Sequence, residues 1–347
     1  MFLCVKKLTT TNNMQSKYHS FLFLLAFVCS FNTEAQTLRK RTTMLMGGRF
    51  DISIVANDSL TAEKSIDEII AEITRIENLI SDWKPTSQVS EVNQNAGIRP
   101  VKVDREVFEL TQRALHFSEI TKGAFDISFA AMDRIWKFDG SMTEMPSAEA
   151  IKKSVEKVGY KNIILDSTQS TIFLKLKGMK IGFGALGEGY ATNKCKNLML
   201  AKGIKAGIVN ATGDMTVWGT QPNGKDWNIG MTNPFDTDKL FAVVPLHDGA
   251  VTTSGSYEKF VVLDGKRYSH IINPATGYPS TGLCSVSVFG PNAETANGFS
   301  TSIMVLGKEA GIKLINQYPD YRWIMITDKG KIIKSKKFTK TKFHLKK

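Results

Sequence analysis

The stretch "GFGALG" at residues 182–187 has the glycine spacing of a turn that could receive phosphate groups. Glycines permit a tight turn and a close backbone approach to a pyrophosphate, and the helical pattern that follows would add the positive end of a helix. A Rossmann dinucleotide site also needs an acidic residue about 20 positions further on. No Asp or Glu occurs between Gly189 and Gly213, so the sequence disfavours a Rossmann site and retains phosphate binding.

Five other stretches share this dense mixture of Gly, Asn, Asp, Ser, Thr and His. They are "GAFDIS" (123–128), "NATGDM" (210–215), "TTSGSYEKF" (252–260), "YSHIINPATGYP" (268–279) and "ANGFSTSIMVLG" (296–307). Each stretch alone has a structural explanation, since Gly and Asn form turns, Ser and Thr cap helices, and a strand histidine can bond to its neighbours. Six of them on one chain favour a polar pocket built from loops of several elements.

The elements between these stretches predict an α+β fold with mostly antiparallel sheets and packed helices. Residues 65–83 place isoleucines on one helical stripe, 107–123 form a second amphipathic pattern, and a third helix is expected over 189–203. Strands separated by short turns are expected in 44–56, 206–219, 227–233, 241–255, 259–273 and 284–290. At 347 residues and 42% apolar content, the chain has the composition of an ordinary globular protein.

The first 35 residues read as a secretory signal peptide. Lys17 and His19 precede the apolar run "FLFLLAFVCSF", and a small-residue cleavage site follows at Ala35. The run is far shorter than the roughly 20 residues that span a bilayer. Cys29 raises the alternative of a lipid anchor, which the preceding Val28 disfavours, and either Met1 or the methionine at position 14 could be the start.

We therefore predict an exported, periplasmic protein that begins near Gln36, close to the inner membrane. Sequencing the N-terminus of the mature protein checks this prediction, and retention of residues 1–35 would contradict it.

The net charge of +12 does not indicate a nucleic-acid partner. Nine lysines lie in the acid-free segment from residue 329 to the end, so the body of the protein is close to neutral. Residues 331–347 are expected to form a basic tail that is solvated or touches an anionic membrane surface. Behind the leader, Cys195 and Cys284 are the remaining cysteines, and they could pair or stay as buried thiols.

Taken in order, these stretches resemble the signature motifs of the ApbE family, the FAD:protein FMN transferases, from Met46 to Gly307. "MGG" (46–48) resembles the family's M-G-T, "SDWKPTSQVSEVN" its aromatic-S-x-x-S-x-x-N segment, and "GAFDIS" its G-A-[FL]-D segment. "GALGEGYA" and "NATGDM" resemble two further motifs, while "TTSGSY" and "SHIINPATGYP" resemble the most specific ones, A-T-S-G-D-Y and S-H-I-[IL]-[DN]-P-x-T-G-x-P. The resemblance implies an ApbE-like, T-fold-related domain over residues 36–330.

The resemblance also implies residue roles. The family cleaves FAD, joins FMN to a Thr or Ser hydroxyl of an acceptor protein and releases AMP, with Mg²⁺ as the metal. It implies His270 as the general base and Ala185 (through its carbonyl), Asn297 and Thr301 as Mg²⁺ ligands. The expected acceptors are membrane-bound electron-transport subunits. The implied FAD-contacting positions are Met46, Trp83, Ala124, Phe125, Asp126, Gly182, Glu188 and Ile271.

Three positions depart from the family pattern. Gly182 and Ser256 stand where the family has Asp, and Asn297 stands where it has a metal-binding Asp. An amide oxygen can ligate Mg²⁺ but brings no charge, so metal affinity is expected to fall. Two alternatives stay open beside the transferase. One is a periplasmic protein that binds or hydrolyses FAD without transfer, and the other is a non-enzymatic binding module.

Overall fold

The computed structural model describes residues 36–257, 259–339 and 344–345, and the predicted signal peptide lies outside them. The described residues from Thr37 onward form one compact unit. The helices, with η for short 3-10 turns, are α2 (Ser59–Ile80), α3 (Gln88–Gln94), α4 (Arg105–Ile120), η1 (Ile127–Ala131), α5 (Ala148–Ser154), η2 (Tyr160–Asn162), α6 (Gly187–Ala201), α7 (Ala293–Leu306), α8 (Lys308–Ile315) and η3 (Lys336–Thr339).

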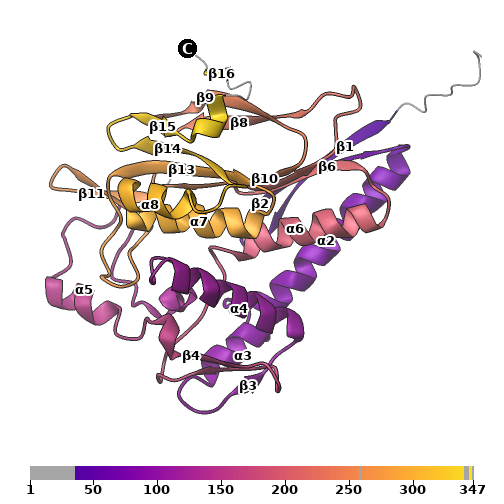
Figure 1. Ribbon diagram of the computed structural model, residues 1–347. Coiled ribbons are helices and arrows are strands. Elements are labelled where there is room, and N and C mark those ends of the chain that lie inside the picture. Colours follow the sequence, from indigo (N-terminus) through magenta and orange to yellow (C-terminus); the bar gives the residue numbers. More distant parts are fainter. Residues whose placement is uncertain (1–35, 258, 340–343, 346–347) are drawn as a thin grey trace, which may run out of the picture. The chain divides into compact units, whose positions relative to one another are not determined.

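The strands come in groups between these helices, the longest being the run from β6 to β13 (Figure 1). They are β1 (Thr37–Leu45), β2 (Gly48–Ala56), β3 (Val101–Lys102), β4 (Ile163–Asp166), β5 (Thr171–Leu174), β6 (Ala206–Ala211), β7 (Asp214–Trp218), β8 (Trp227–Asn233), β9 (Asp236–Leu246), β10 (Gly249–Gly255), β11 (Phe260–Leu263), β12 (Lys266–Ser269), β13 (Leu283–Gly290), β14 (Arg322–Thr327), β15 (Ile332–Lys334) and β16 (His344–Leu345).

One large sheet organises the molecule. Its eight strands run in the order β1-β2-β6-β7-β10-β13-β14-β15, and every neighbouring pair is antiparallel. Smaller sheets are formed by β16-β9-β8, by β3-β5-β4 and by the hairpin β11-β12. The predicted α+β class with mostly antiparallel sheets is confirmed. A Rossmann fold needs parallel strands, and no strand pair among the described residues is parallel.

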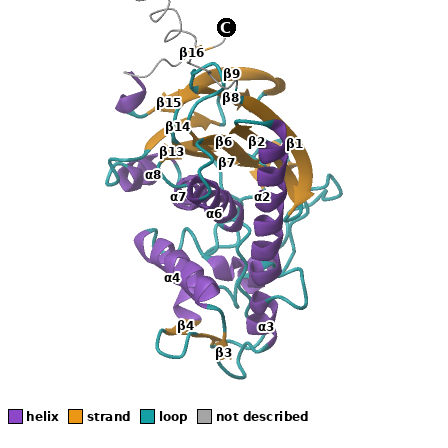
Figure 2. Cartoon of the chain, turned by 90° about the vertical axis from the view of Figure 1, so that its right-hand side faces the viewer, coloured by secondary structure: helices purple, strands orange, loops and turns teal. Residues whose placement is uncertain are grey.

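The two faces of the large sheet are covered differently (Figure 2). Helices α2, α6 and α7 pack on one face, while strands β8 and β9 pack on the other. Alternate strand residues point to opposite faces. Ile54 therefore joins the helical core while its neighbour Val55 joins the core beneath β8 and β9. This three-layer arrangement positions α6, which carries Glu188, and α7, which carries Asn297 and Thr301.

Helix α2 shows how the sequence pattern produces the core. Ile66, Ile69, Ile73 and Ile76 are fully buried and Ile80 nearly so, because they recur on one helical stripe that faces the sheet. Asp58 caps the first turn by accepting a hydrogen bond from the backbone of Thr61 at 2.8 Å. The sequence pattern placed the start of this helix at residue 65, six positions late, because its first turn contains few apolar residues.

Helices α6 and α7 come into direct backbone contact at Gly189. A methyl group at this position would lie 2.9 Å from the carbonyl carbon and oxygen of Ala293 and 3.0 Å from the backbone nitrogen of Glu294. Real side chains do not approach a backbone that closely, so only glycine fits. The contact brings the first turns of both helices together.

The structure corrects two details at the ends of the chain. Residues 37–45 form β1, which the sequence pattern did not predict because its "TLRKRTTML" lacks apolar alternation. In the segment expected to be a basic tail, Ile332–Lys334 pair with β14 and Phe338 is buried against Phe289, with ring centroids 5.2 Å apart. Both Cys195 and Cys284 are buried and free. None of the helices in the described part of the chain is long and apolar enough to cross a membrane.

Candidate functional site

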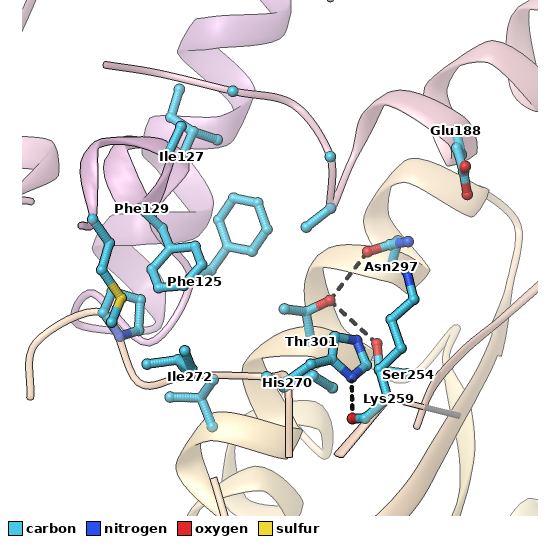
Figure 3. A pocket seen from close by; sticks show the side chains of 18 of the residues that line it. Phe125, Ile127, Phe129, Glu188, Ser254, Lys259, His270, Ile272, Asn297 and Thr301 are labelled. Carbon is cyan, nitrogen blue, oxygen red and sulfur yellow. Dashed lines mark hydrogen bonds between the residues drawn. The ribbon is translucent and has the colours of Figure 1, made fainter. Parts of the chain in front are cut away.

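A cavity of about 770 Å³ gathers all of the predicted site residues. Its volume lies in the upper part of the usual range for small-molecule sites, about 300–1,000 Å³. Figure 3 shows several of the side chains that line it. The twelve predicted residues around it are Met46, Trp83, Ala124, Phe125, Asp126, Gly182, Ala185, Glu188, His270, Ile271, Asn297 and Thr301.

The glycine-rich turn is held in place by a side-chain clamp. The amide of Asn93 accepts a hydrogen bond from the backbone N–H of Ile181 at 2.7 Å and donates one to its carbonyl at 2.9 Å. The next residue, Gly182, donates to the carbonyl of Ile127 at 3.0 Å. Helix α6 then begins at Gly187 without a side-chain cap. The Gly187 N–H already donates to the Phe183 carbonyl at 2.6 Å, so the N–H groups of Glu188 and Gly189 are the ones in this first turn that an anionic ligand could use.

Side-chain oxygen atoms of α7 and β10 lie close together in the part of the cavity where the Mg²⁺ ligands are predicted; this part is called the oxygen corner below. Asn297 and Thr301 lie four residues apart on α7, and the Asn297 Oδ1 accepts a hydrogen bond from the Thr301 Oγ1 at 3.2 Å. The Ser254 Oγ of β10 lies 3.2 Å from the same hydroxyl (Figure 3). Neighbouring ligands of an octahedral Mg²⁺ are about 3 Å apart, since each lies about 2.1 Å from the ion. The spacing of the two α7 oxygens therefore suits a shared Mg²⁺.

Asp214 explains how Asn297 is oriented. The Asn297 Nδ2 donates a hydrogen bond to the Asp214 carboxylate, which turns the amide oxygen towards Thr301. The described residues contain no cluster of three or more His, Cys, Asp or Glu side chains able to hold an ion. A cation at this corner would therefore depend on neutral oxygens such as those of Asn297 and Thr301.

The buried carboxyl group of Asp214 and the half-buried one of Glu188 border this corner. Burial raises the pKa of Asp214 well above its ordinary value, and the nearby Glu188 raises it further. Burial also raises the pKa of Glu188, against the effects of a hydrogen bond from Thr212 and the charge of Lys259. A bound cation would favour the ionised form of both groups. The corner therefore suits a cation electrostatically.

Aromatic side chains line the opposite part of the cavity. Phe125 lies just before η1 and Phe129 lies within it. Trp136 and Phe138 follow η1 in the chain. Trp83 is 72% exposed, and the guanidinium of Arg134 lies 4.5 Å from its ring centroid. Such surfaces stack on planar rings, so this part suits the ring systems of a dinucleotide.

Asp126 is fixed by its own loop. One carboxylate oxygen accepts hydrogen bonds from the backbone and hydroxyl of Ser128 at 2.8 and 2.6 Å, and the other accepts from the backbone of Tyr160 at 2.8 Å. The carboxylate therefore holds η1 in place. A ligand could use only its remaining acceptor capacity.

His270 follows the β11-β12 hairpin and lines the same cavity. Its Nδ1 lies 3.0 Å from the backbone carbonyl of Lys259. A carbonyl can only accept, so Nδ1 carries a proton, and in the neutral ring the lone pair that a general base needs is on Nε2. The hairpin itself packs on Trp136, which fixes the position of the histidine relative to η1.

Several lining residues were missed by the sequence analysis. Asp82, Arg134 and Lys259 contribute charges to the cavity, and Trp136 contributes a ring. Lys259 belongs to one of the polar stretches, and Asp82 precedes the predicted Trp83. Arg134 lies in "AAMDRIWKF", which carries no pattern that indicates a site.

The fold and cavity together define an antiparallel α+β protein built to hold a large ligand with aromatic and anionic parts. A sequence model of the ApbE family matches residues 46–325, and the chain belongs to this family.

Proteins and solved structures similar to this chain are named as members of the same family. The FAD:protein FMN transferase of Treponema pallidum is 30% identical over 270 residues, which cover 74% of this chain and 75% of that protein. The enzyme of the same name from Escherichia coli K12 is 29% identical over 309 residues, covering 87% of each chain. A solved structure of the ApbE protein from Thermotoga maritima superposes with a TM-score of 0.79 at 29% identity, covering 87% of this chain and 98% of that one.

Proposed function

We infer that this chain is a FAD:protein FMN transferase. The observation that carries the inference is that twelve residues predicted from scattered motifs surround one cavity, with oxygen donors at one corner and aromatic rings at another. The reaction breaks the pyrophosphate bond of FAD. The hydroxyl oxygen of an acceptor Thr or Ser bonds to the FMN phosphorus, and AMP leaves.

The residues of the chain divide this task. The aromatic side chains and Met46 hold the rings, and the N-terminus of α6 faces the phosphates. His270 takes the proton of the attacking hydroxyl through Nε2. Ala185, Asn297 and Thr301 would hold Mg²⁺, which would supply positive charge to offset that of the pyrophosphate. We propose that the protein acts in the periplasm on membrane-bound electron-transport subunits.

The test uses the mature protein with FAD, Mg²⁺ and an acceptor protein that carries Thr or Ser. We expect covalent flavin fluorescence on the acceptor in a denaturing gel, equimolar release of AMP, and loss of both signals with a chelator. Release of FMN and AMP without labelling, also when acceptors of several kinds are supplied, would instead indicate hydrolysis of FAD. A protein that binds no FAD would contradict both.

The metal corner makes a separate prediction. Asn297→Asp is expected to tighten Mg²⁺ binding by about tenfold, because it adds a charge beside the ion. Without metal the new carboxylate faces that of Asp214, so the variant should unfold at a lower temperature than wild type, and Mg²⁺ should raise its Tm by more. Thermal unfolding with and without Mg²⁺ measures both effects, and FAD cleavage should rise.

Asn292→Asp is the matched control, because Asn292 and not Asn297 caps α7. Asp and Asn are equally good caps, so this variant should respond to Mg²⁺ as wild type does. An Asn297→Asp variant with unchanged Mg²⁺ dependence would show that residue 297 does not ligate the ion.

A further inference from the structure

Asp82 lies in the space that a side chain at position 182 would occupy. A methyl group on Gly182 would be 3.3 Å from both the Cγ and the Oδ2 of Asp82, and 3.1 Å from the Cβ of Ala130. Gly182 does not have a positive φ, so its backbone would accept a side chain. Ala130 and the Asp82 carboxyl group, which reaches this point from the segment after α2, together leave little space for a side chain at residue 182.

This position is one where the chain departs from the family pattern, because Gly182 replaces an Asp. The structure thus has a carboxyl group next to this position, carried by a different residue. We propose that Asp82 supplies the carboxylate that position 182 lacks and accepts a hydrogen bond from an N–H or O–H group on a ring or sugar of FAD. The proposal rests on the proposed function, because it assigns a contact to the flavin substrate.

The surroundings of Asp82 leave its carboxylate available to a ligand. In the described part of the chain, no other residue donates a hydrogen bond to it and no cation lies within ion-pair distance. Burial raises its pKa, while the more distant charges of Lys180 and Arg134 act in the opposite direction. Asp126 differs, since three protein groups already bond to its carboxylate. Of these two acids, Asp82 is the one with unused acceptor capacity.

The chemistry of a carboxylate limits its partner on FAD. A phosphate would be repelled, whereas the flavin and adenine rings and the sugars all carry N–H or O–H donors. Asp82 directly precedes Trp83, and its carboxyl lies near Ala130 of η1, in the segment that also brings Phe129 to the cavity. This location favours a ring or sugar donor.

The first experiment measures FAD binding to the wild type and to Asp82→Asn by calorimetry. Losing a charged acceptor should raise the Kd for FAD by about ten- to hundredfold, with Tm nearly unchanged. Asp238→Asn is the matched control, because Asp238 is exposed on β9 and lies outside the cavity. Riboflavin and ADP, tested separately, identify which half of FAD loses affinity.

The second experiment exchanges the two positions. Gly182→Asp alone should weaken FAD binding, because it crowds two carboxyl groups together. The double variant Asp82→Ala with Gly182→Asp should bind FAD more tightly than Asp82→Ala alone, because it returns one carboxylate to the same space.

The outcomes separate this inference from the proposed function. Wild type that binds no FAD would overturn the proposed function and this contact with it. If the wild type binds FAD and the Asp82→Asn variant binds it with the same affinity, only the proposed Asp82 contact is overturned. Asp82 also borders an adjoining cavity of about 670 Å³. A variant with normal FAD affinity but a raised KM for the acceptor would assign Asp82 to that cavity and likewise overturn the contact.

Discussion

His270→Ala is expected to slow FMN transfer by about two orders of magnitude or more while FAD affinity stays nearly unchanged. The hydrogen bond from Nδ1 to the Lys259 carbonyl fixes the tautomer, so Nε2 is the atom that accepts a proton. The base acts on the acceptor hydroxyl and not on the flavin, so the substitution removes a step without removing a binding contact. Initial rates of acceptor labelling, together with calorimetry for FAD, measure the two quantities separately.

His247→Ala is the control for this variant. His247 is exposed and lies outside the cavity, with its Nδ1 3.2 Å from the Oδ1 of Asp226. Its removal should therefore leave the transfer at the wild-type rate. Transfer by His270→Ala at the wild-type rate would make the histidine part of the scaffold. The base would then be sought among the cavity carboxylates, first Asp214 and Glu188.

The second large effect is on stability. Gly189→Ala is expected to lower the free energy of unfolding by about 1–3 kcal/mol, because its methyl group would meet the backbone of α7 and push two packed helices apart. The oxygen donors of α7 would move away from Ala185 and Glu188, so the Mg²⁺-dependent rise in Tm should shrink as well. Denaturant unfolding with and without Mg²⁺ measures both.

Gly184→Ala is the matched control for stability, since nothing lies within 4 Å of its added methyl group and its φ is not positive. This variant should unfold at the wild-type denaturant concentration or slightly above it. If Gly189→Ala unfolds there too, the two helices can separate without cost, and the close contact is not needed.

The sequence predicts those parts of the fold in which the spacing of apolar residues along the chain matches the residues that are buried. The isoleucines of α2 repeat with the helical period because one stripe faces the sheet, so the helix can be read directly. Phe338 gives the opposite case. It lies among nine lysines, and only its packing on Phe289, 49 positions earlier in the chain (338 − 289), places it in the core.

The candidate site divides in the same way. His270, Asn297 and Thr301 lie within stretches whose composition is itself unusual, so the amino-acid sequence alone is enough to propose them. Asp82 could not be proposed in this way, because its proximity to Gly182 follows from how the segment after α2 passes the glycine-rich turn, 100 residues later in the chain (182 − 82). A position lost from a motif gives no indication of which distant residue fills its space.

Strand β1 has a consequence for the solubility of the protein. It forms one edge of the large sheet, where unpaired backbone groups could recruit a strand from another molecule. Lys40 is exposed along this edge, and Arg39 and Arg41 form ion pairs with Glu63 and Asp67 of α2, so charged side chains flank the edge and oppose such pairing between copies. The other edge, β15, has only three residues. The charged composition that hid β1 from sequence analysis is thus a protection against aggregation, and apolar replacements there should favour intermolecular sheet growth.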